Sequence, residues 1–106
     1  IGFPTMNLRT DFPLIPKRGV YVSTVEIDGK KFQAVTNIGV NPTFDGQSQT
    51  IETFILDFSA DLYGRNATLH FLARLRDELK FGSADELVEW IGRDVRAARE
   101  YFYKSQ

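Results

Sequence analysis

Two β-branched runs separated by a single Asp-Gly pair constrain the fold of this chain more than any other feature. Residues 19–26 alternate along the chain with a period of two, and residues 31–38 return with the same period. Asp28 and Gly29 lie between the runs, and Asp-Gly is a preferred pair for a two-residue type I′ turn. The sequence therefore predicts a β-hairpin, and with it an antiparallel sheet.

Residues 50–58 are rich in β-branched and aromatic side chains and predict an interior strand. Alternate side chains on a strand share a face, so one face carries Ile51, Thr53 and Ile55. The other face carries Glu52, Phe54, Leu56 and Phe58. A carboxylate among apolar neighbours is a common arrangement for a general base, but an idle carboxylate at the wet end of a strand fits the same pattern.

A further strand is predicted at residues 67–76, with Leu69, Phe71, Ala73 and Leu75 on one face. His70 lies on the other face with Thr68 and Leu72, and a single histidine without a second ligand favours a structural role.

Residues 83–86 form a capping box, which predicts the start of a helix. From there, apolar side chains at helical spacing form one stripe up to about residue 103: Leu87, Val88, Ile91, Val95, Ala98 and Phe102. Trp90 is expected in the core or at its margin.

Two polar segments could carry function. Thr5 and Asn7 are two residues apart, so in an extended segment their oxygens point the same way and could bind magnesium or phosphate, although taken alone the pattern favours ordinary turn chemistry after a proline. Residues 37–46 contain two glycines and a proline, and we expect a long polar turn there, either a functional loop or a plain connection.

Composition narrows the classes of function. A chain of 106 residues is expected to form one domain, and a net charge of -1 gives no general attraction to nucleic acid or anionic lipid. The absence of cysteine excludes disulfides, thiolate nucleophiles and cysteine-bound zinc, and one histidine cannot form a histidine metal cluster. Any metal should be a hard cation such as Mg²⁺. No apolar run is long enough to cross a bilayer, so a soluble, cytoplasmic protein is expected.

Several short strands followed by one terminal helix predict a mostly β domain, an antiparallel barrel with the helix packed outside. The sequence contains no P-loop and no dinucleotide-binding glycine motif, so any nucleotide phosphate must be bound in another way.

Several motifs stand in one order along the chain and together resemble the ATP-dependent riboflavin kinase domain. They are GFPTMNL at residues 2–8, GVY at 19–21, NIGVNPTF at 37–44, IETFILDF at 51–58, DLYGR at 61–65, FLARLRDE at 71–78 and KF at 80–81. In bacteria that domain usually forms the C-terminal half of the bifunctional riboflavin kinase/FMN adenylyltransferase, also called FAD synthetase. The resemblance thus implies a flavoprotein that acts as a transferase in FAD biosynthesis. It also implies an N-terminal FMN adenylyltransferase domain in the same parent chain.

The resemblance implies a six-stranded antiparallel Greek-key barrel with a C-terminal helix, and transfer of the ATP γ-phosphate to riboflavin, giving FMN. By motif match, Glu52 is the base, and Thr5 and Asn7 bind Mg²⁺ and the nucleotide phosphates. The match further implies ATP-binding residues Asn37, Pro42, Thr43 and Tyr63. The segment around Arg76 and Phe81 is implied to bind the flavin.

The chain departs from the family pattern in two respects. Family members carry a further strand and a flexible glycine-containing loop before the motif at residues 2–8, and this sequence starts after them. Family members also commonly have histidine where this chain has Phe54. The missing segment motivates an alternative, a non-catalytic β-barrel module that binds a flavin or nucleotide. A nucleic-acid-binding barrel is less favoured because no basic face with interleaved aromatic residues is visible.

Overall fold

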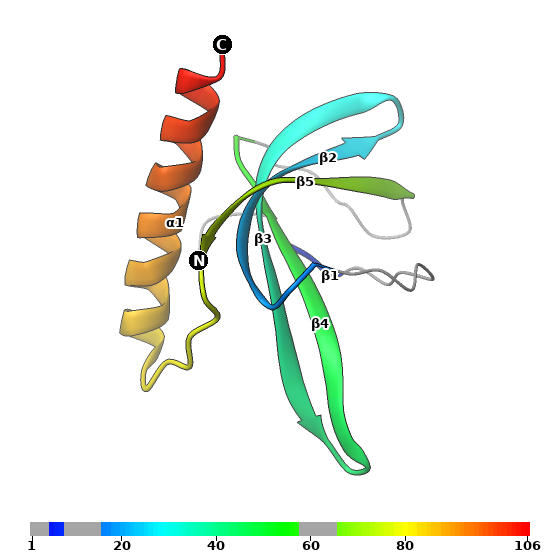
Figure 1. The fold of residues 1–106 in the computed structure, drawn as a ribbon, viewed down its shortest axis with the longest axis vertical. Helices are drawn as coiled ribbons and strands as arrows, with labels where there is room; N and C mark the ends of the chain where they lie inside the picture. The colour runs from blue at the N-terminus through cyan, green and yellow to red at the C-terminus, as the bar shows by residue number, and fades with distance from the viewer. Residues whose placement is uncertain (1–4, 8–15, 58–65) are drawn as a thin grey trace.

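In the part of the chain that the structure describes, five antiparallel strands form one sheet and one long helix packs on it (Figure 1). The computed structural model describes residues 5–7, 16–57 and 66–106, with the backbone alone for residues 5–7, 41 and 42. In chain order the elements are β1 (Thr5–Asn7), β2 (Gly19–Ile27), β3 (Lys30–Thr43), β4 (Gly46–Ile55), β5 (Ala67–Arg76) and α1 (Ala84–Lys104). The strands lie in the order β1-β4-β3-β2-β5.

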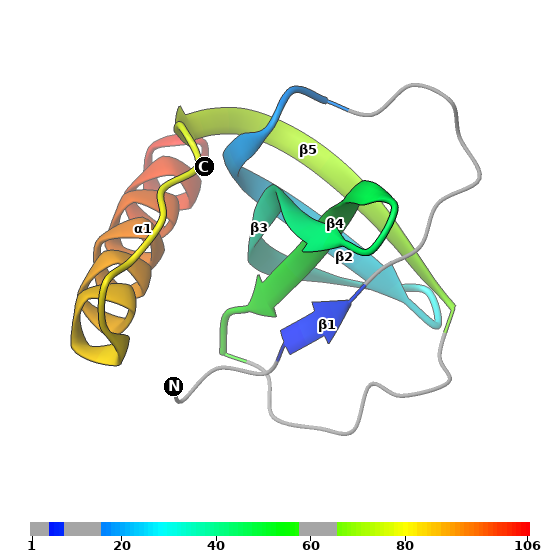
Figure 2. The same cartoon turned by 90° about the horizontal axis from the view of Figure 1, so that it is seen from below.

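The strand order contains a Greek key. β2, β3 and β4 are joined by hairpins, and β5 returns to lie beside β2, which gives the spatial order 4-1-2-3 of that motif. Figure 2 shows the strands curling around while α1 stays outside the curl. The prediction of a mostly β, antiparallel Greek-key fold with an outer C-terminal helix is confirmed. β1 and β5 are the sheet edges, and within the described ranges they do not pair to close a barrel.

The β2–β3 hairpin has the turn that the sequence predicts. Pairing runs from Gly19 opposite Ile38 to Ile27 opposite Lys30, which leaves Asp28 and Gly29 as the two-residue turn. Their φ angles are 52° and 80°, both in the left-handed region that a type I′ turn requires.

The expected long polar turn at residues 37–46 is wrong. β3 continues to Thr43 and β4 begins at Gly46, so only Phe44 and Asp45 form the turn. The outer part of this hairpin projects from the sheet as a two-stranded ribbon (Figure 1), and residues 43–49 are exposed. Because such a ribbon has water on both faces and pairs its own backbone, it needs no apolar alternation, and its polar, glycine and proline content resembles that of a loop.

Apolar side chains form a core on each face of the sheet. The cluster between the sheet and α1 contains Val20, Val22, Val35, Leu56, Ile91, Val95 and Ala98. The cluster on the opposite face contains Val25, Ile27, Ala34 and Ile55. As predicted, Ile51, Thr53 and Ile55 are buried together on one face of β4. Leu56 is buried but follows the end of β4, and Phe58 lies outside the described residues.

Three buried hydroxyl groups connect β2, β3 and β4 on the face away from α1. Thr36 Oγ1 lies 2.8 Å from Ser23 Oγ and 3.0 Å from Thr53 Oγ1. Each hydroxyl can both donate and accept, so these polar groups satisfy one another without water. They stabilise the register in which β3 lies between its two neighbours.

Helix α1 begins at the predicted cap. The Ser83 side chain accepts a hydrogen bond of 3.2 Å from the Glu86 amide, whereas the Glu86 carboxylate accepts from the Gly82 amide at 3.4 Å. The apolar stripe is confirmed except at Val88, which is 51% exposed. Val88 lies about 100° around the helix from Leu87, so it points off the buried face.

Candidate active site

One residue from each strand contributes to a single row across the sheet. Asn7 pairs with Glu52, Glu52 with Asn37, Asn37 with Val20, and Val20 with Arg76. Directly opposed positions in antiparallel strands share a face, and here it is the face that α1 covers. The register therefore aligns four polar residues that lie far apart in the sequence.

A β-bulge is responsible for the position of Arg76 in that row. Tyr21 pairs with Arg74 and Val20 pairs with Arg76, so Leu75 is an extra residue on β5. Without this irregularity Leu75 would lie opposite Val20, and Arg76 would point to the other face. Bulges are common beside active sites because they re-aim one side chain in this way.

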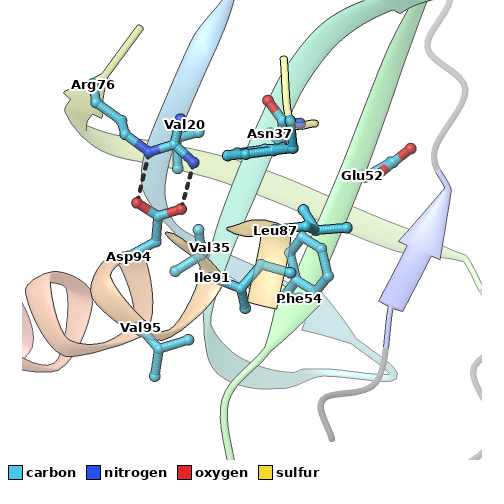
Figure 3. A pocket seen from close by; sticks show the side chains of 11 residues that line it. Val20, Val35, Asn37, Glu52, Phe54, Arg76, Leu87, Ile91, Asp94 and Val95 are labelled. Atoms are coloured by element: carbon cyan, nitrogen blue, oxygen red, sulfur yellow. Dashed lines mark hydrogen bonds and ion pairs between the residues drawn. The ribbon is translucent and has the colours of Figure 1, made fainter. Parts of the chain in front are cut away.

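A cavity of about 170 Å³ lies between α1 and the sheet (Figure 3). Its lining combines an apolar wall with a few polar groups, as small-molecule sites do. The lining residues are Val20, Val35, Asn37, Glu52, Phe54, Arg76, Phe81, Leu87, Ile91, Asp94 and Val95. Four residues that the resemblance implicates are thus brought together: Glu52, Asn37, Arg76 and Phe81.

The side-chain oxygen of Asn37 is buried without a partner. Among the described residues no donor lies within hydrogen-bonding distance of Asn37 Oδ1, although the atom is removed from solvent. A buried acceptor without a hydrogen bond is costly for a folded protein, and binding sites are where such groups persist. The cavity therefore offers an acceptor that a ligand hydroxyl, or a hard cation, would satisfy.

Arg76 is held rigidly at the helix side of the cavity. Its Nε and Nη2 donate to the two carboxylate oxygens of Asp94 at 2.8 and 2.7 Å, and its Nη1 donates to the Asp77 carbonyl at 2.9 Å. The guanidinium carbon lies 5.0 Å from the centre of the Trp90 ring. Trp90 is half-buried, which agrees with the expected position at the core margin. These contacts set both the position and the plane of the guanidinium.

The donors around the cavity suit a hard cation better than a soft one. Glu52 and Asn37 supply carboxylate and amide oxygens, and Asn7 is paired with Glu52 in the register. Mg²⁺ prefers such oxygens and typically takes one or two protein ligands together with substrate phosphates. Within the described ranges, no group of three or more His, Asp or Glu side chains is placed to hold a metal alone. The donor set therefore fits Mg²⁺ that arrives with a nucleotide.

The cavity lining formed by the described side chains does not include the other implicated residues. Pro42 and Thr43 pair with Gln47 and Gly46 at the outer end of the ribbon, about 17 and 20 Å along β3 from Asn37 at ~3.3 Å per residue. Their role, like that of Thr5, which pairs with Phe54, stays a prediction. Tyr63 lies outside the described residues.

His70 also lies away from the cavity. Its Nε2 lies 3.8 Å from the Glu26 carboxylate, and both side chains are nearly half exposed. This surface position is consistent with the structural role expected for it.

Sequence reasoning missed Asp94, although the sequence held a signal for it. Asp94 follows Ile91 by three residues and precedes Val95, so helical spacing puts a carboxylate inside the apolar stripe. A charged residue at such a position needs a buried partner, and the structure supplies Arg76.

The described residues contain no helix with the length and apolar character that a bilayer crossing requires.

Comparison with known proteins gives a consistent family assignment. The family described as "Flavokinase: Riboflavin kinase" matches residues 1–102. The bifunctional riboflavin kinase/FMN adenylyltransferase of Haemophilus influenzae is 39% identical over 103 residues, covering 96% of this chain and 33% of that protein. The protein of the same name from Pseudomonas fluorescens is 42% identical over 100 residues, covering 93% of this chain and 32% of its own length. The chain thus spans about a third of these relatives.

One solved structure supports the fold. A crystal structure described as a macrolide-efflux protein from Streptococcus pneumoniae superposes with a TM-score of 0.84 at 40% identity, covering 92% of this chain and 33% of that one. Its description differs from the names of the sequence relatives, whereas the family match and both of those relatives agree with one another.

Proposed function

Since this chain belongs to the riboflavin kinase family, we propose that it transfers the γ-phosphoryl group of ATP to the 5′-hydroxyl of riboflavin, giving FMN and ADP. The observation that carries the proposal is the shared cavity of Glu52, Asn37 and Arg76 against the apolar face of α1. A substrate with a flat ring and a polyhydroxyl chain needs both kinds of surface.

Glu52 is the general base in this proposal. Its carboxylate takes the proton of the 5′-hydroxyl while the new O–P bond forms and the bond between the γ-phosphorus and the bridging oxygen of ATP breaks. Phosphoryl transfer depends mainly on positioning and on charge neutralisation. One correctly placed carboxylate is therefore enough to activate the acceptor hydroxyl.

Thr5 and Asn7 bind the nucleotide phosphates and Mg²⁺ in this proposal. The proposal is supported by the register, in which Asn7 on β1 is paired with Glu52 on β4. When bound, Mg²⁺ neutralises the charge that develops on the transferred group. The chain's own contribution is to hold neutral oxygen ligands at the edge of the sheet where ATP meets the acceptor hydroxyl.

The flavin ring binds between the sheet and α1. Leu87, Ile91 and Val95 form an apolar wall that suits a flat aromatic ring, and Phe81 lies beside it. In this proposal Asn37 Oδ1 accepts from a ribityl hydroxyl, because it is a buried acceptor without a hydrogen-bond partner among the described residues. This reassigns Asn37 from the ATP side to the flavin side of the site.

The test is direct formation of FMN. Purified full-length protein is incubated with riboflavin, ATP and Mg²⁺, and the products are separated by chromatography. FMN in equal amount to ADP is the expected result, whereas binding of riboflavin and ATP without turnover would replace this proposal by the non-catalytic binding module. Appearance of FAD in the same reaction would show that an adenylyltransferase domain accompanies this chain, as the names of its relatives suggest.

A further inference from the structure

Asp94 is a buried charge without an assigned role. Only 7% of the residue is exposed, and it is the one charged member of the buried set within the described ranges. Its neighbours on α1, Ile91, Val95 and Ala98, are all in the core. An apolar residue at such a position is often as good for stability as a buried ion pair, so stability alone is a weak reason for a carboxylate here.

The carboxylate of Asp94 engages only one edge of Arg76. Asp94 bonds Nε–H and one N–H of Nη2, and the Asp77 carbonyl takes one N–H of Nη1. A guanidinium has five N–H groups, so one on Nη1 and one on Nη2 remain beyond these three bonds. Arg76 lines the cavity, and none of these three hydrogen bonds uses those two N–H groups.

A second set of contacts fixes the plane of the guanidinium. Trp90 lies against Arg76 and also against Arg93, whose guanidinium carbon is 4.6 Å from the ring centre. Arg93 in turn donates to Glu89 at 2.7 Å. The indole is therefore held from the helix side, and Arg76 has little freedom to rotate.

Pairing with Asp94 also changes what Arg76 can recognise. The carboxylate neutralises the guanidinium charge locally, so the pair attracts an anion such as phosphate less than a free arginine does. Two fixed N–H donors with little net charge suit a neutral planar acceptor, such as a ring carbonyl with an adjacent ring nitrogen.

The distance between the two ends of the row suits such a ligand. Glu52 and Arg76 are three strands apart, about 14 Å along the sheet at ~4.8 Å per strand. Riboflavin carries its reacting hydroxyl at one end and its ring carbonyls at the other, joined by a five-carbon chain.

We propose that Asp94 is a positioning residue that orients and neutralises Arg76 so that its two remaining N–H donors bind the carbonyl edge of the flavin ring. The proposal rests on the proposed riboflavin kinase function. It assigns to α1 a part in selecting the acceptor substrate, in addition to covering the sheet.

The test compares Asp94→Asn with Asp57→Asn in the full-length protein. Both variants remove the charge of an aspartate that bonds an arginine through two hydrogen bonds, but Asp57 bonds Arg99, away from the cavity lining, and its side chain is 69% exposed. We expect Asp94→Asn to raise the riboflavin dissociation constant about tenfold, measured by flavin fluorescence at a temperature where the variant is folded, with less than a twofold change in KM for ATP. Asp57→Asn should change neither.

Arg76→Lys provides a second variant that keeps the charge but cannot form the two-pronged contact. It should weaken riboflavin binding similarly, and combining it with Asp94→Asn should add little, because both act through one contact. An unchanged riboflavin dissociation constant in both single variants would overturn the proposal, as would equal losses for riboflavin and ATP. A wild-type protein that binds riboflavin but forms no FMN would instead refute the proposed function. The riboflavin dissociation constants of the variants would still decide whether Asp94 positions Arg76.

Discussion

Glu52 on β4 lies directly opposite Asn37 on β3, and both side chains line the cavity beneath α1. One supplies a carboxylate and the other a buried oxygen without a hydrogen bond. Such a pair is hard to explain by stability, since neither group satisfies the other. It is readily explained by a bound hydroxyl, which can donate to Asn37 at one position of a sugar-like chain and to Glu52 at its end.

Replacing Glu52 by Gln should abolish most of the activity and leave the fold intact. Gln keeps the size of the side chain but cannot take the proton, and a positioned base commonly contributes about 10²-fold or more to turnover. The measurement is kcat for FMN formation, together with circular dichroism. Glu26→Gln is the matched control, because Glu26 is a strand carboxylate at the surface near His70. A variant with wild-type turnover would remove Glu52 from the mechanism.

Replacing Asn37 by Ala should weaken riboflavin binding without weakening the fold. Asn37 Oδ1 has no hydrogen-bond partner among the described residues, so its removal leaves no buried donor unpaired. The free energy of unfolding should therefore change by less than about 1 kcal/mol. Loss of one ligand hydrogen bond should raise the riboflavin dissociation constant about fivefold to tenfold. Denaturant unfolding and fluorescence titration measure the two effects. A large loss of stability with unchanged binding would mean that Asn37 is structural.

Replacing Thr36 by Val should lower the stability of the fold and leave riboflavin binding unchanged, which is the opposite of the result expected for the Asn37 variant. Thr36 precedes Asn37 on β3 but faces away from α1, where its hydroxyl contacts Ser23 and Thr53. Its removal leaves two buried hydroxyls short of a partner and should cost about 1–3 kcal/mol of unfolding free energy. Riboflavin binding by the folded variant should stay at the wild-type level. Unchanged stability would show that the three hydroxyls do not depend on one another.

Replacing Asn7 by Ala should raise the Mg²⁺ concentration that half-maximal activity requires. Loss of one oxygen ligand weakens the binding of a hard cation that has few protein ligands. The checks are a Mg²⁺ titration of FMN formation and calorimetric binding of ATP with and without Mg²⁺. Asn66→Ala, an exposed amide just before β5, is the control. Identical titrations for the variant and the wild type would exclude Asn7 as a ligand.

The contact between Asp57 and Arg99 should make stability depend on pH below neutrality. Arg99 donates to both oxygens of Asp57 at 2.8 and 3.0 Å and holds the pKa of that carboxyl below its ordinary value of 3.8. A carboxyl with a lowered pKa in the folded state adds stability above its ordinary pKa and loses it as the pH falls through the lowered value. The wild type should therefore be more stable than Asp57→Asn near neutral pH, and the difference should vanish well below about pH 4.

Denaturant unfolding of the wild type and Asp57→Asn across that pH range measures this effect. Asn is a suitable replacement because Asp57 has a φ of 55°, which asparagine adopts readily. The difference should be small because the pair is exposed, and added salt should reduce it. A difference that persists at acid pH would assign the effect to the backbone and not to the charge.

Local chemistry made several features of the fold predictable. Asp28-Gly29 can form only a small set of turns, and Ser83 with Glu86 marks a helix start, so both are determined by neighbouring residues. The alternation around Glu52 predicted its face because strand geometry has a fixed period. The polar ribbon beyond Val40 was wrongly predicted as a loop. Its composition indicates that the side chains contact water, but it does not indicate whether the backbone is paired.

The sequence by itself determined the hairpin, the capped helix, the faces of β4 and, through its ordered motifs, the family. The prediction that Leu69, Ala73 and Leu75 share one face of β5 is wrong: Leu69 packs in the cluster away from α1, whereas Ala73 and Leu75 pack in the cluster beneath it, because β5 has register shifts against β2. Only the tertiary structure decided that Glu52, Asn37 and Arg76 share one cavity, because that depends on strand register and on a bulge at Leu75 that no local pattern announces. It also decided that Asp94 meets Arg76, since two residues 18 positions apart on different elements are joined by packing of α1 on the sheet. Local residue preferences set each element, but register and packing are collective properties of the whole chain.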